Sequence, residues 1–274
     1  MLIKQVAVKN ILTKSKLPDA DYVINPYIGC NHHCVYCYAE FMSRFTGHTG
    51  EKWGDFMDVK EGYKILSTEK MSGQTILLGS ATDPYNPLEN KYEKTRNILL
   101  QLENGKADIE ILTKSPLVLR DIDILSRMKH IRVGISLSTT DTVFARLTEK
   151  SAASPDKRID AMRQLHLAKI PVYAFVSPLF PFLSDYKAIV SAVEEYADEI
   201  CFENLNLRGN YKQAVLDLIA KHYPEVFANF VAVYNSKQNF NRYWQAKQEE
   251  IETFMRKRKT PYKMYFFHDK IKKA

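Results

Sequence analysis

The chain has 274 residues and a formal net charge of +7, from 39 Lys and Arg side chains against 32 Asp and Glu. Hydrophobic residues make up 45% of it and charged residues 26%, which excludes a disordered chain, a collagen-like repeat and a disulfide-dense miniprotein. No apolar run approaches the ~18 residues of a membrane span, and the first residues lack a signal-peptide pattern. We therefore expect a cytoplasmic protein with no membrane partner.

From about residue 21, short apolar segments alternate with amphipathic ones. The predicted strands, rich in aliphatic and aromatic residues, are Tyr22–Ile28, Thr75–Gly79, Ile109–Thr113, Ile131–Leu137, Val172–Val176 and Glu199–Glu203. The predicted helices between them are Asn90–Glu103, Pro116–Met128, Pro155–Ala168 and Asp185–Ala197. This alternation predicts a parallel α/β architecture, wound as a barrel or an open sheet, with functional residues at the carboxyl ends of the strands.

After about Asn206 the pattern changes to helices without strands. These helices are Tyr211–His222, Pro224–Tyr234 and Asn239–Arg258, and a short aromatic run, Tyr262–Phe267, follows them. We therefore divide the chain into an N-terminal extension (1–20), a core (21–206) and a helical C-terminal region with a basic tail (207–274). Residues 256–273 hold eight basic side chains and one acid, which predicts attraction to polyanions such as nucleic acid. The alternative is a solvated helix end that aids solubility.

The most informative feature is a cluster of cysteines directly after the first predicted strand. Three of the four cysteines lie within eight residues, at Cys30, Cys34 and Cys37. In a reducing compartment such a cluster favours a metal site, and thiolates select iron–sulfur clusters, zinc or copper(I). Three close cysteines can hold three corners of a [4Fe–4S] cubane and leave the fourth iron open. The alternative is a zinc site with His32 or His33 as the fourth ligand.

The spacing Cys30-x3-Cys34-x2-Cys37, with an aromatic residue before the last cysteine, resembles the signature of radical S-adenosylmethionine (SAM) enzymes. The wider string from Asn25 to Ala39 resembles the spore photoproduct lyase-like branch. The resemblance implies a partial (β/α)6 barrel with a C-terminal helical appendage. It also implies a [4Fe–4S] cluster on the three cysteines, whose open iron chelates SAM. Reductive cleavage of SAM would give a 5′-deoxyadenosyl radical that abstracts hydrogen from the substrate. A flavodoxin or ferredoxin type of electron donor is also expected, as is a monomer.

Several residues after the strand ends are candidates for binding SAM. Thr82 and Asp83 offer a hydroxyl and a carboxylate to the methionine end of SAM, although Asp83 before a proline is equally typical of a turn. In similar proteins a lysine at the position of Lys114 contacts the SAM carboxylate. The alternative is that Lys114 caps the next helix.

The fourth and fifth strands add three more candidates. Alternation places Ser136 and Ser138 on one face of the fourth strand, where serine hydroxyls would hydrogen-bond ribose or carboxylate. Val176, at the end of the fifth strand, would pack against adenine.

The resemblance also suggests catalytic residues. Tyr36 and Tyr38 flank Cys37 and resemble the radical-relay and cofactor-contact positions of the family. Cys201 faces the barrel interior if its neighbour Ile200 faces the helices, and its thiol would then return hydrogen to a product radical. The alternative for Cys201 is a small buried hydrophobe. Ser80 stands where spore photoproduct lyase has its hydrogen-donating cysteine, which argues against repair of the spore lesion itself.

Three hypotheses for function follow. The first is radical SAM chemistry on nucleic acid, either lesion repair or base modification, in which Tyr262, Tyr265, Phe266 and Phe267 stack on bases beside basic side chains. The second keeps the chemistry and changes the substrate to a peptide or small metabolite. The third is a zinc-stabilised nucleic-acid-binding protein without catalysis. A polar set after the sixth strand would meet substrate or join the core to the appendage: Glu203, Asn204, Asn206 and Arg208.

Overall fold

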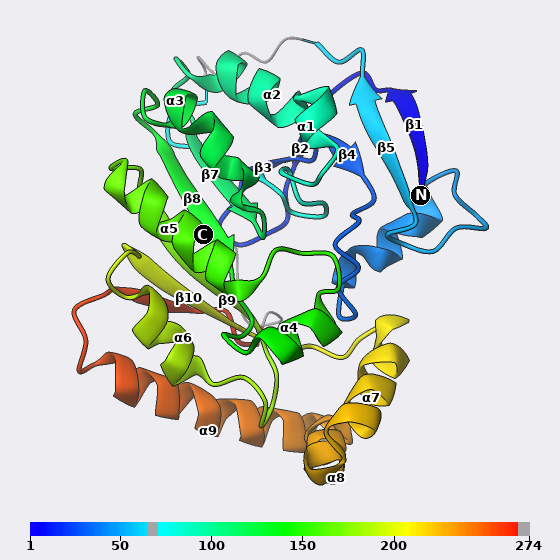
Figure 1. Ribbon diagram of the computed structural model, residues 1–274, viewed down its shortest axis with the longest axis vertical. Helices are drawn as coiled ribbons and strands as arrows, with labels where there is room; N and C mark the ends of the chain where they lie inside the picture. Colours follow the sequence, from blue (N-terminus) through cyan, green and yellow to red (C-terminus); the bar gives the residue numbers. More distant parts are fainter. Residues whose placement is uncertain (65–70, 268–274) are drawn as a thin grey trace.

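The computed structural model describes residues 1–64 and 71–267 and has an α/β fold built on two sheets (Figure 1). In these residues eight strands form the main sheet, in the order β11-β10-β9-β8-β7-β6-β3-β2. Their bounds are Leu12–Lys14 (β2), Tyr22–Ile24 (β3), Thr75–Leu78 (β6), Asp108–Thr113 (β7), Ile131–Ser136 (β8), Val172–Leu179 (β9), Glu199–Asn204 (β10) and Tyr262–Met264 (β11). All neighbours pair in parallel except β2 with β3. The predicted α/β partial barrel is confirmed.

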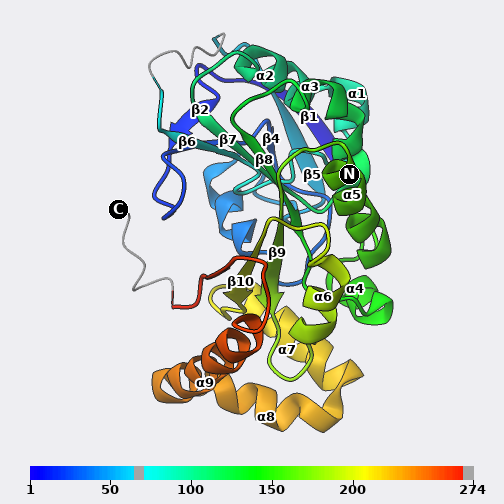
Figure 2. The same cartoon turned by 90° about the vertical axis from the view of Figure 1, so that its left-hand side faces the viewer.

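Helices cover one face of the main sheet, as Figure 2 shows for α2, α3, α5 and α6. The helices of the core are Glu89–Tyr92 (α1), Lys94–Leu102 (α2), Ile122–Leu125 (α3), Thr142–Thr148 (α4), Pro155–Leu167 (α5) and Tyr186–Val193 (α6). Two 3₁₀ helices are Tyr38–Phe45 (η1) and Pro116–Asp121 (η2). No helix in the described part of the chain has the length and apolar composition needed to cross a bilayer.

Two predicted elements are broken for local reasons. The first predicted strand divides into β3 and β4 (Tyr27–Ile28), because Pro26 between them has no N–H to continue the ladder. Strand β4 turns away and pairs with β5 (Phe56–Glu61) in a second sheet, which β1 (Leu2–Ala7) completes. The predicted helix over 90–103 divides at Glu93, whose left-handed φ of 45° ends α1 before α2 begins.

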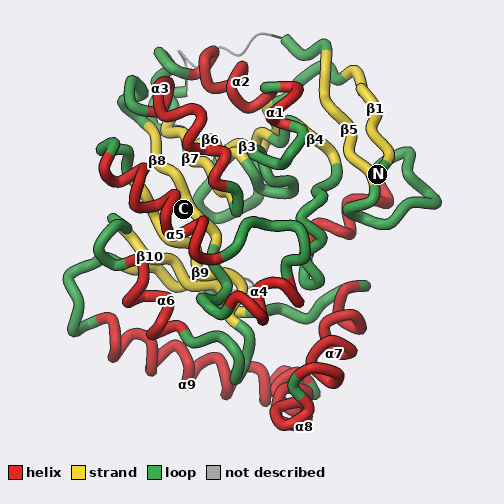
Figure 3. Tube along the Cα trace, in the orientation of Figure 1, coloured by secondary structure: helices red, strands yellow, loops and turns green. Residues whose placement is uncertain are grey.

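The C-terminal helices are confirmed as Tyr211–His222 (α7), Pro224–Tyr234 (α8) and Lys237–Met255 (α9). They lie at the opposite end of the molecule from β1 and β5 (Figure 3). The aromatic run after them returns to the main sheet, where β11 pairs in parallel with β10. Residues 1–20, predicted as an N-terminal extension, likewise contribute a strand to each sheet. The domain boundaries stay a prediction, and Asp269, Lys270, Lys272 and Lys273 of the basic tail lie outside the described residues.

The aromatic side chains at the start of that tail pack within the protein. Phe266 is buried with its ring 5.2 Å from that of Trp244, and Phe267 lies 6.3 Å from Phe240. The Tyr265 hydroxyl donates a hydrogen bond to Asp19. These rings therefore take part in packing within the protein, and their stacking on bases stays a prediction.

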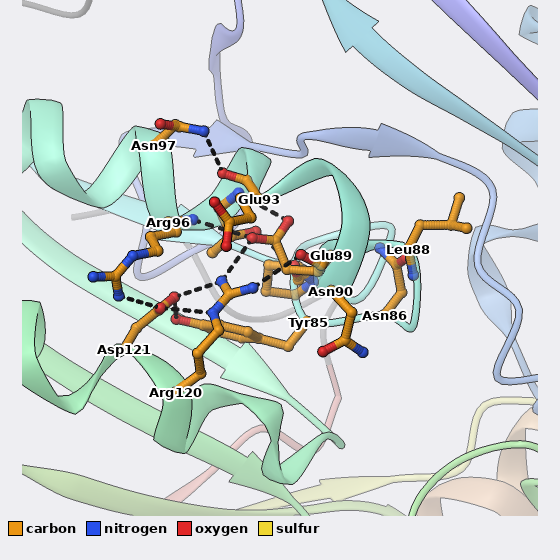
Figure 4. A network of polar contacts seen from close by, with 12 residues as sticks. Tyr85, Asn86, Leu88, Glu89, Asn90, Glu93, Arg96, Asn97, Arg120 and Asp121 are labelled. Atoms are coloured by element: carbon orange, nitrogen blue, oxygen red, sulfur yellow. Dashed lines mark hydrogen bonds and ion pairs between the residues drawn. The ribbon is translucent and has the colours of Figure 1, made fainter.

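The segment after β6 is held by a buried polar network, shown in Figure 4. The Glu89 carboxylate, fully buried, accepts hydrogen bonds from the backbone N–H of Thr95 (3.0 Å) and Arg96 (3.2 Å) at the start of α2. Arg120 pairs with Glu89 at 2.9 Å and also with Asp121. Buried charges are stable only when paired in this way. The network holds the segment through Tyr85, whose hydroxyl donates to Asp121 at 3.1 Å, and through the Pro84 carbonyl, which accepts from the Thr95 hydroxyl at 2.5 Å; two predicted SAM-binding residues, Thr82 and Asp83, directly precede them.

Candidate active site

The cysteine loop begins at a position that only glycine fits. Gly29 has a φ of +87°, and a Cβ there would lie 2.3 Å from the Phe56 carbonyl oxygen. Gly54, two residues before Phe56, is also close to the loop. A Cβ added to Gly54 would lie 2.7 Å from His33 Nδ1. Residues 53–56 therefore pack directly against the loop that carries the three cysteines.

The other side of the loop pairs with the chain after α4. The Val35 N–H donates to the Thr148 carbonyl at 2.8 Å, and the Ser151 N–H donates to the His32 carbonyl at 3.0 Å. The loop is thus held between residues 53–56 and residues 148–151. All three thiols are free and close enough for their charges to interact, whereas Cys201 lies elsewhere. Burial raises the pKa of each thiol, that of Cys30 to about 12.

This donor set fits an iron–sulfur cluster. Three close thiolates in a buried site repel one another, and the positive charge of bound iron offsets both the repulsion and the burial. Among the described residues, no three His, Cys, Asp or Glu side chains converge on a point where a single metal ion would bind. A cubane differs from such a site, because its thiolates bind separate iron corners. The zinc alternative stays a prediction.

Asp83 joins two strand ends to the cysteine loop. Its buried carboxylate accepts hydrogen bonds from the Thr113 hydroxyl (2.6 Å), the Lys114 N–H (2.7 Å) and the Tyr85 N–H (2.8 Å). His32 Nδ1 lies 3.5 Å away. The bond to Tyr85 closes a turn, so Asp83 has the turn-forming role and also lies beside the loop. Thr82 is buried next to it.

A buried carboxylate that the sequence did not reveal organises the opposite side of the site. Glu149 is 2% exposed and accepts hydrogen bonds from the Tyr36 hydroxyl, from Arg158 and from Ser138 Oγ (3.3 Å). Lys114 Nζ lies 3.9 Å from it. Burial alone would raise the pKa of Glu149, but Arg158 and Lys114 outweigh that effect, so the pKa lies below its usual value.

Four predicted SAM-binding residues therefore meet in one place. Lys114 Nζ donates to Ser136 Oγ at 2.8 Å and lies 5.8 Å from the centre of the Tyr36 ring. Ser138 Oγ donates to Glu149, which also contacts Lys114 and the Tyr36 hydroxyl. The prediction that Lys114 only caps a helix is not supported by this geometry, because its ammonium points to β8.

The remaining predicted residues are less closely grouped. Val176 is fully buried in the hydrophobic core, whereas its neighbour Ser177 hydrogen-bonds Glu203, so Val176 lies on the face turned towards the helices. The Tyr38 side chain is 55% exposed, and its hydroxyl donates to the Ser80 carbonyl. Cys201 is 1% exposed, on the face opposite the apolar Ile200, and its thiol lies 3.6 Å from Glu199. The catalytic role of Cys201 stays a prediction.

Comparison with known proteins agrees with this geometry. Residues 24–191 match the radical SAM superfamily, and the chain belongs to it. It is 35% identical over 241 residues to the uncharacterised protein MJ0683 of Methanocaldococcus jannaschii, covering 88% of this chain and 90% of that protein. It is 24% identical over 246 residues to Mb2609c of Mycobacterium bovis, covering 82% of this chain and 72% of that protein.

Solved structures share the fold at low sequence identity. Spore photoproduct lyase complexed with dinucleoside spore photoproduct matches with a TM-score of 0.64 and 15% identity, over 96% of this chain and 82% of that one. SuiB of Streptococcus suis bound to S-adenosylmethionine matches with a TM-score of 0.54 and 14% identity, over 89% of this chain and 49% of that one.

Replacing Gly29 by alanine should destabilise the cysteine loop. Alanine at this position would have to keep the left-handed φ of +87°, and its Cβ would collide with the Phe56 carbonyl. We therefore expect a loss of about 1–3 kcal/mol in the free energy of unfolding. Urea unfolding followed by circular dichroism measures it. Gly50→Ala is the control, because Gly50 has open space around it. Equal unfolding midpoints for the two variants would contradict the packing of residues 53–56 on the loop.

Proposed function

We propose that this chain is a radical SAM enzyme in which Cys30, Cys34 and Cys37 bind a [4Fe–4S] cluster and SAM binds beside it. The observation that carries the proposal is the position of the three thiols. They lie on one loop, and the Cys34 thiol interacts electrostatically with Lys114, which follows β7, and with Glu149. When bound, the cluster supplies the electron that cleaves SAM to methionine and a 5′-deoxyadenosyl radical, which abstracts hydrogen from substrate.

The chain's own residues bind and orient SAM in this proposal. The Lys114 ammonium attracts the SAM carboxylate, while Glu149 and Ser136 hold that ammonium in place. Tyr36 is 9% exposed and presents its ring beside Lys114, with its hydroxyl fixed by Glu149. Burial of these groups excludes water from a site where a carbon radical must be shielded from competing reactions.

Anaerobic reconstitution tests the proposal. The wild-type chain should bind about four irons. With dithionite and SAM it should release 5′-deoxyadenosine. Cys34→Ser should lose both properties, because one corner of the cluster has no thiolate. Cys201→Ser should keep the iron and the release of 5′-deoxyadenosine in the absence of substrate. A colourless wild-type protein that binds zinc would overturn the proposal.

We propose nucleic acid as the substrate class, for lesion repair or base modification. Support comes from the net charge of +7, which residues 256–273 account for. Spore photoproduct lyase, which shares the fold, has been solved in complex with dinucleoside spore photoproduct. Ser80 Oγ accepts a hydrogen bond from Asn25 at 2.9 Å, and its strong O–H bond makes it a poor hydrogen-atom donor. The proposed reaction is therefore not repair of the spore lesion by the route of the lyase.

Removing charge from the described part of the basic tail should weaken nucleic-acid binding. Arg256, Lys257 and Lys259 are exposed, and changing all three to Gln should lower the affinity for a single-stranded oligonucleotide. The slope of log K against log salt should become shallower by up to about 3. Fluorescence anisotropy at several salt concentrations measures both quantities.

The control is the matched triple change of Lys4, Lys9 and Lys14, which are also exposed, to Gln. Equal losses in both triple variants would indicate unspecific attraction by net charge. No loss in either would favour the peptide or small-metabolite hypothesis.

A further inference from the structure

Trp53 lies in the segment that packs against the cysteine loop. It follows η1 and precedes β5, and its ring meets that of Phe56 edge-to-face at 5.8 Å. Its neighbour Gly54 is so close to His33 that no side chain fits there. The ring contact with Phe56 and the close approach of Gly54 to His33 therefore hold the Trp53 indole beside the cysteine loop.

The indole N–H of Trp53 is a buried donor whose hydrogen bonding is incomplete in the described part of the chain. Nε1 is inaccessible to solvent and makes no complete hydrogen bond within the described residues. A buried donor of this kind is rare in folded proteins and calls for an explanation.

The polar group that interacts with the Trp53 indole N–H is the Cys37 thiol, which also interacts with the backbone N–H groups of Ala39 and Glu40. A neutral thiol is a weak hydrogen-bond acceptor. An iron-bound thiolate carries negative charge and accepts such a donor fully.

We propose that Trp53 donates its indole N–H to the Cys37 thiolate and thereby raises the reduction potential of the cluster. The inference rests on the proposed function, since it requires a bound cluster. Reduction adds negative charge that the thiolates share, and a donor aimed at one of them stabilises the reduced form more than the oxidised form. The Cys30 thiol interacts with the backbone N–H groups of His32 and Asp83. Substituting a side chain does not remove a backbone N–H. Trp53 is a donor that mutagenesis can test.

Trp53→Phe removes the N–H and keeps an aromatic ring. In a redox titration of the reconstituted full chain, followed by electron paramagnetic resonance, its midpoint potential should be more negative than that of the wild type. At a fixed potential the ratio of reduced to oxidised cluster should fall about tenfold, which is about 59 mV for a one-electron couple. Trp244→Phe is the matched control, because Trp244 Nε1 is also buried and makes no complete hydrogen bond within the described residues, but lies in α9. Its potential should equal that of the wild type.

A second measurement does not depend on Trp53→Phe keeping its cluster. The chain has two tryptophans, so Trp244→Phe leaves Trp53 alone. With ¹⁵N-indole labelling, electron–nuclear double resonance of the reduced Trp244→Phe protein should detect a weakly coupled nitrogen and an exchangeable proton. A wild-type chain that binds no iron would overturn the proposed function. A bound cluster with no indole coupling, or with equal potentials in wild type and Trp53→Phe, would overturn the inference about Trp53 alone.

Discussion

The buried ion pair between Glu149 and Arg158 is the interaction on which the site depends. Both side chains are at most 2% exposed, and a charge so placed is stable only when it is paired and hydrogen-bonded. Arg158 also donates to the carbonyls of Ser136 (3.1 Å) and Ala153 (2.8 Å), so the pair connects α5 to the end of β8. Through the Tyr36 hydroxyl the same carboxylate contacts the cysteine loop. Breaking such a pair typically costs about 3–5 kcal/mol.

Asp83 likewise connects separate segments of the chain on the other side of the cysteine loop. It accepts hydrogen bonds from the Thr113 hydroxyl and the Lys114 backbone, while the Lys114 ammonium reaches towards Glu149. Lys114 is thus positioned at both ends by buried carboxylates. In the proposed function, a site preorganised in this way would bind the methionine part of SAM without first having to order its own side chains.

Local patterns explain what the sequence predicted well. The cysteine spacing lies within eight residues, and the alternation of apolar strands with amphipathic helices follows from burial of β7 to β10 under helices. The features that the sequence did not predict depend on contacts between segments far apart along the chain. Glu149 follows α4, which the sequence did not predict, and its partners are 9 to 113 residues away. Val176 was predicted in the site because it ends a strand, yet its side chain lies on the apolar face. Strand β11 depends on pairing with β10, which no local pattern reveals.

The central claim is that three thiolates leave one iron open for SAM. Mössbauer spectroscopy of the chain reconstituted with iron-57 tests it most directly, because each iron of the cluster contributes its own signal. On addition of SAM, the account predicts that one iron in four changes its isomer shift while the other three keep theirs. A spectrum that SAM leaves unchanged, or in which all four irons change together, would contradict it.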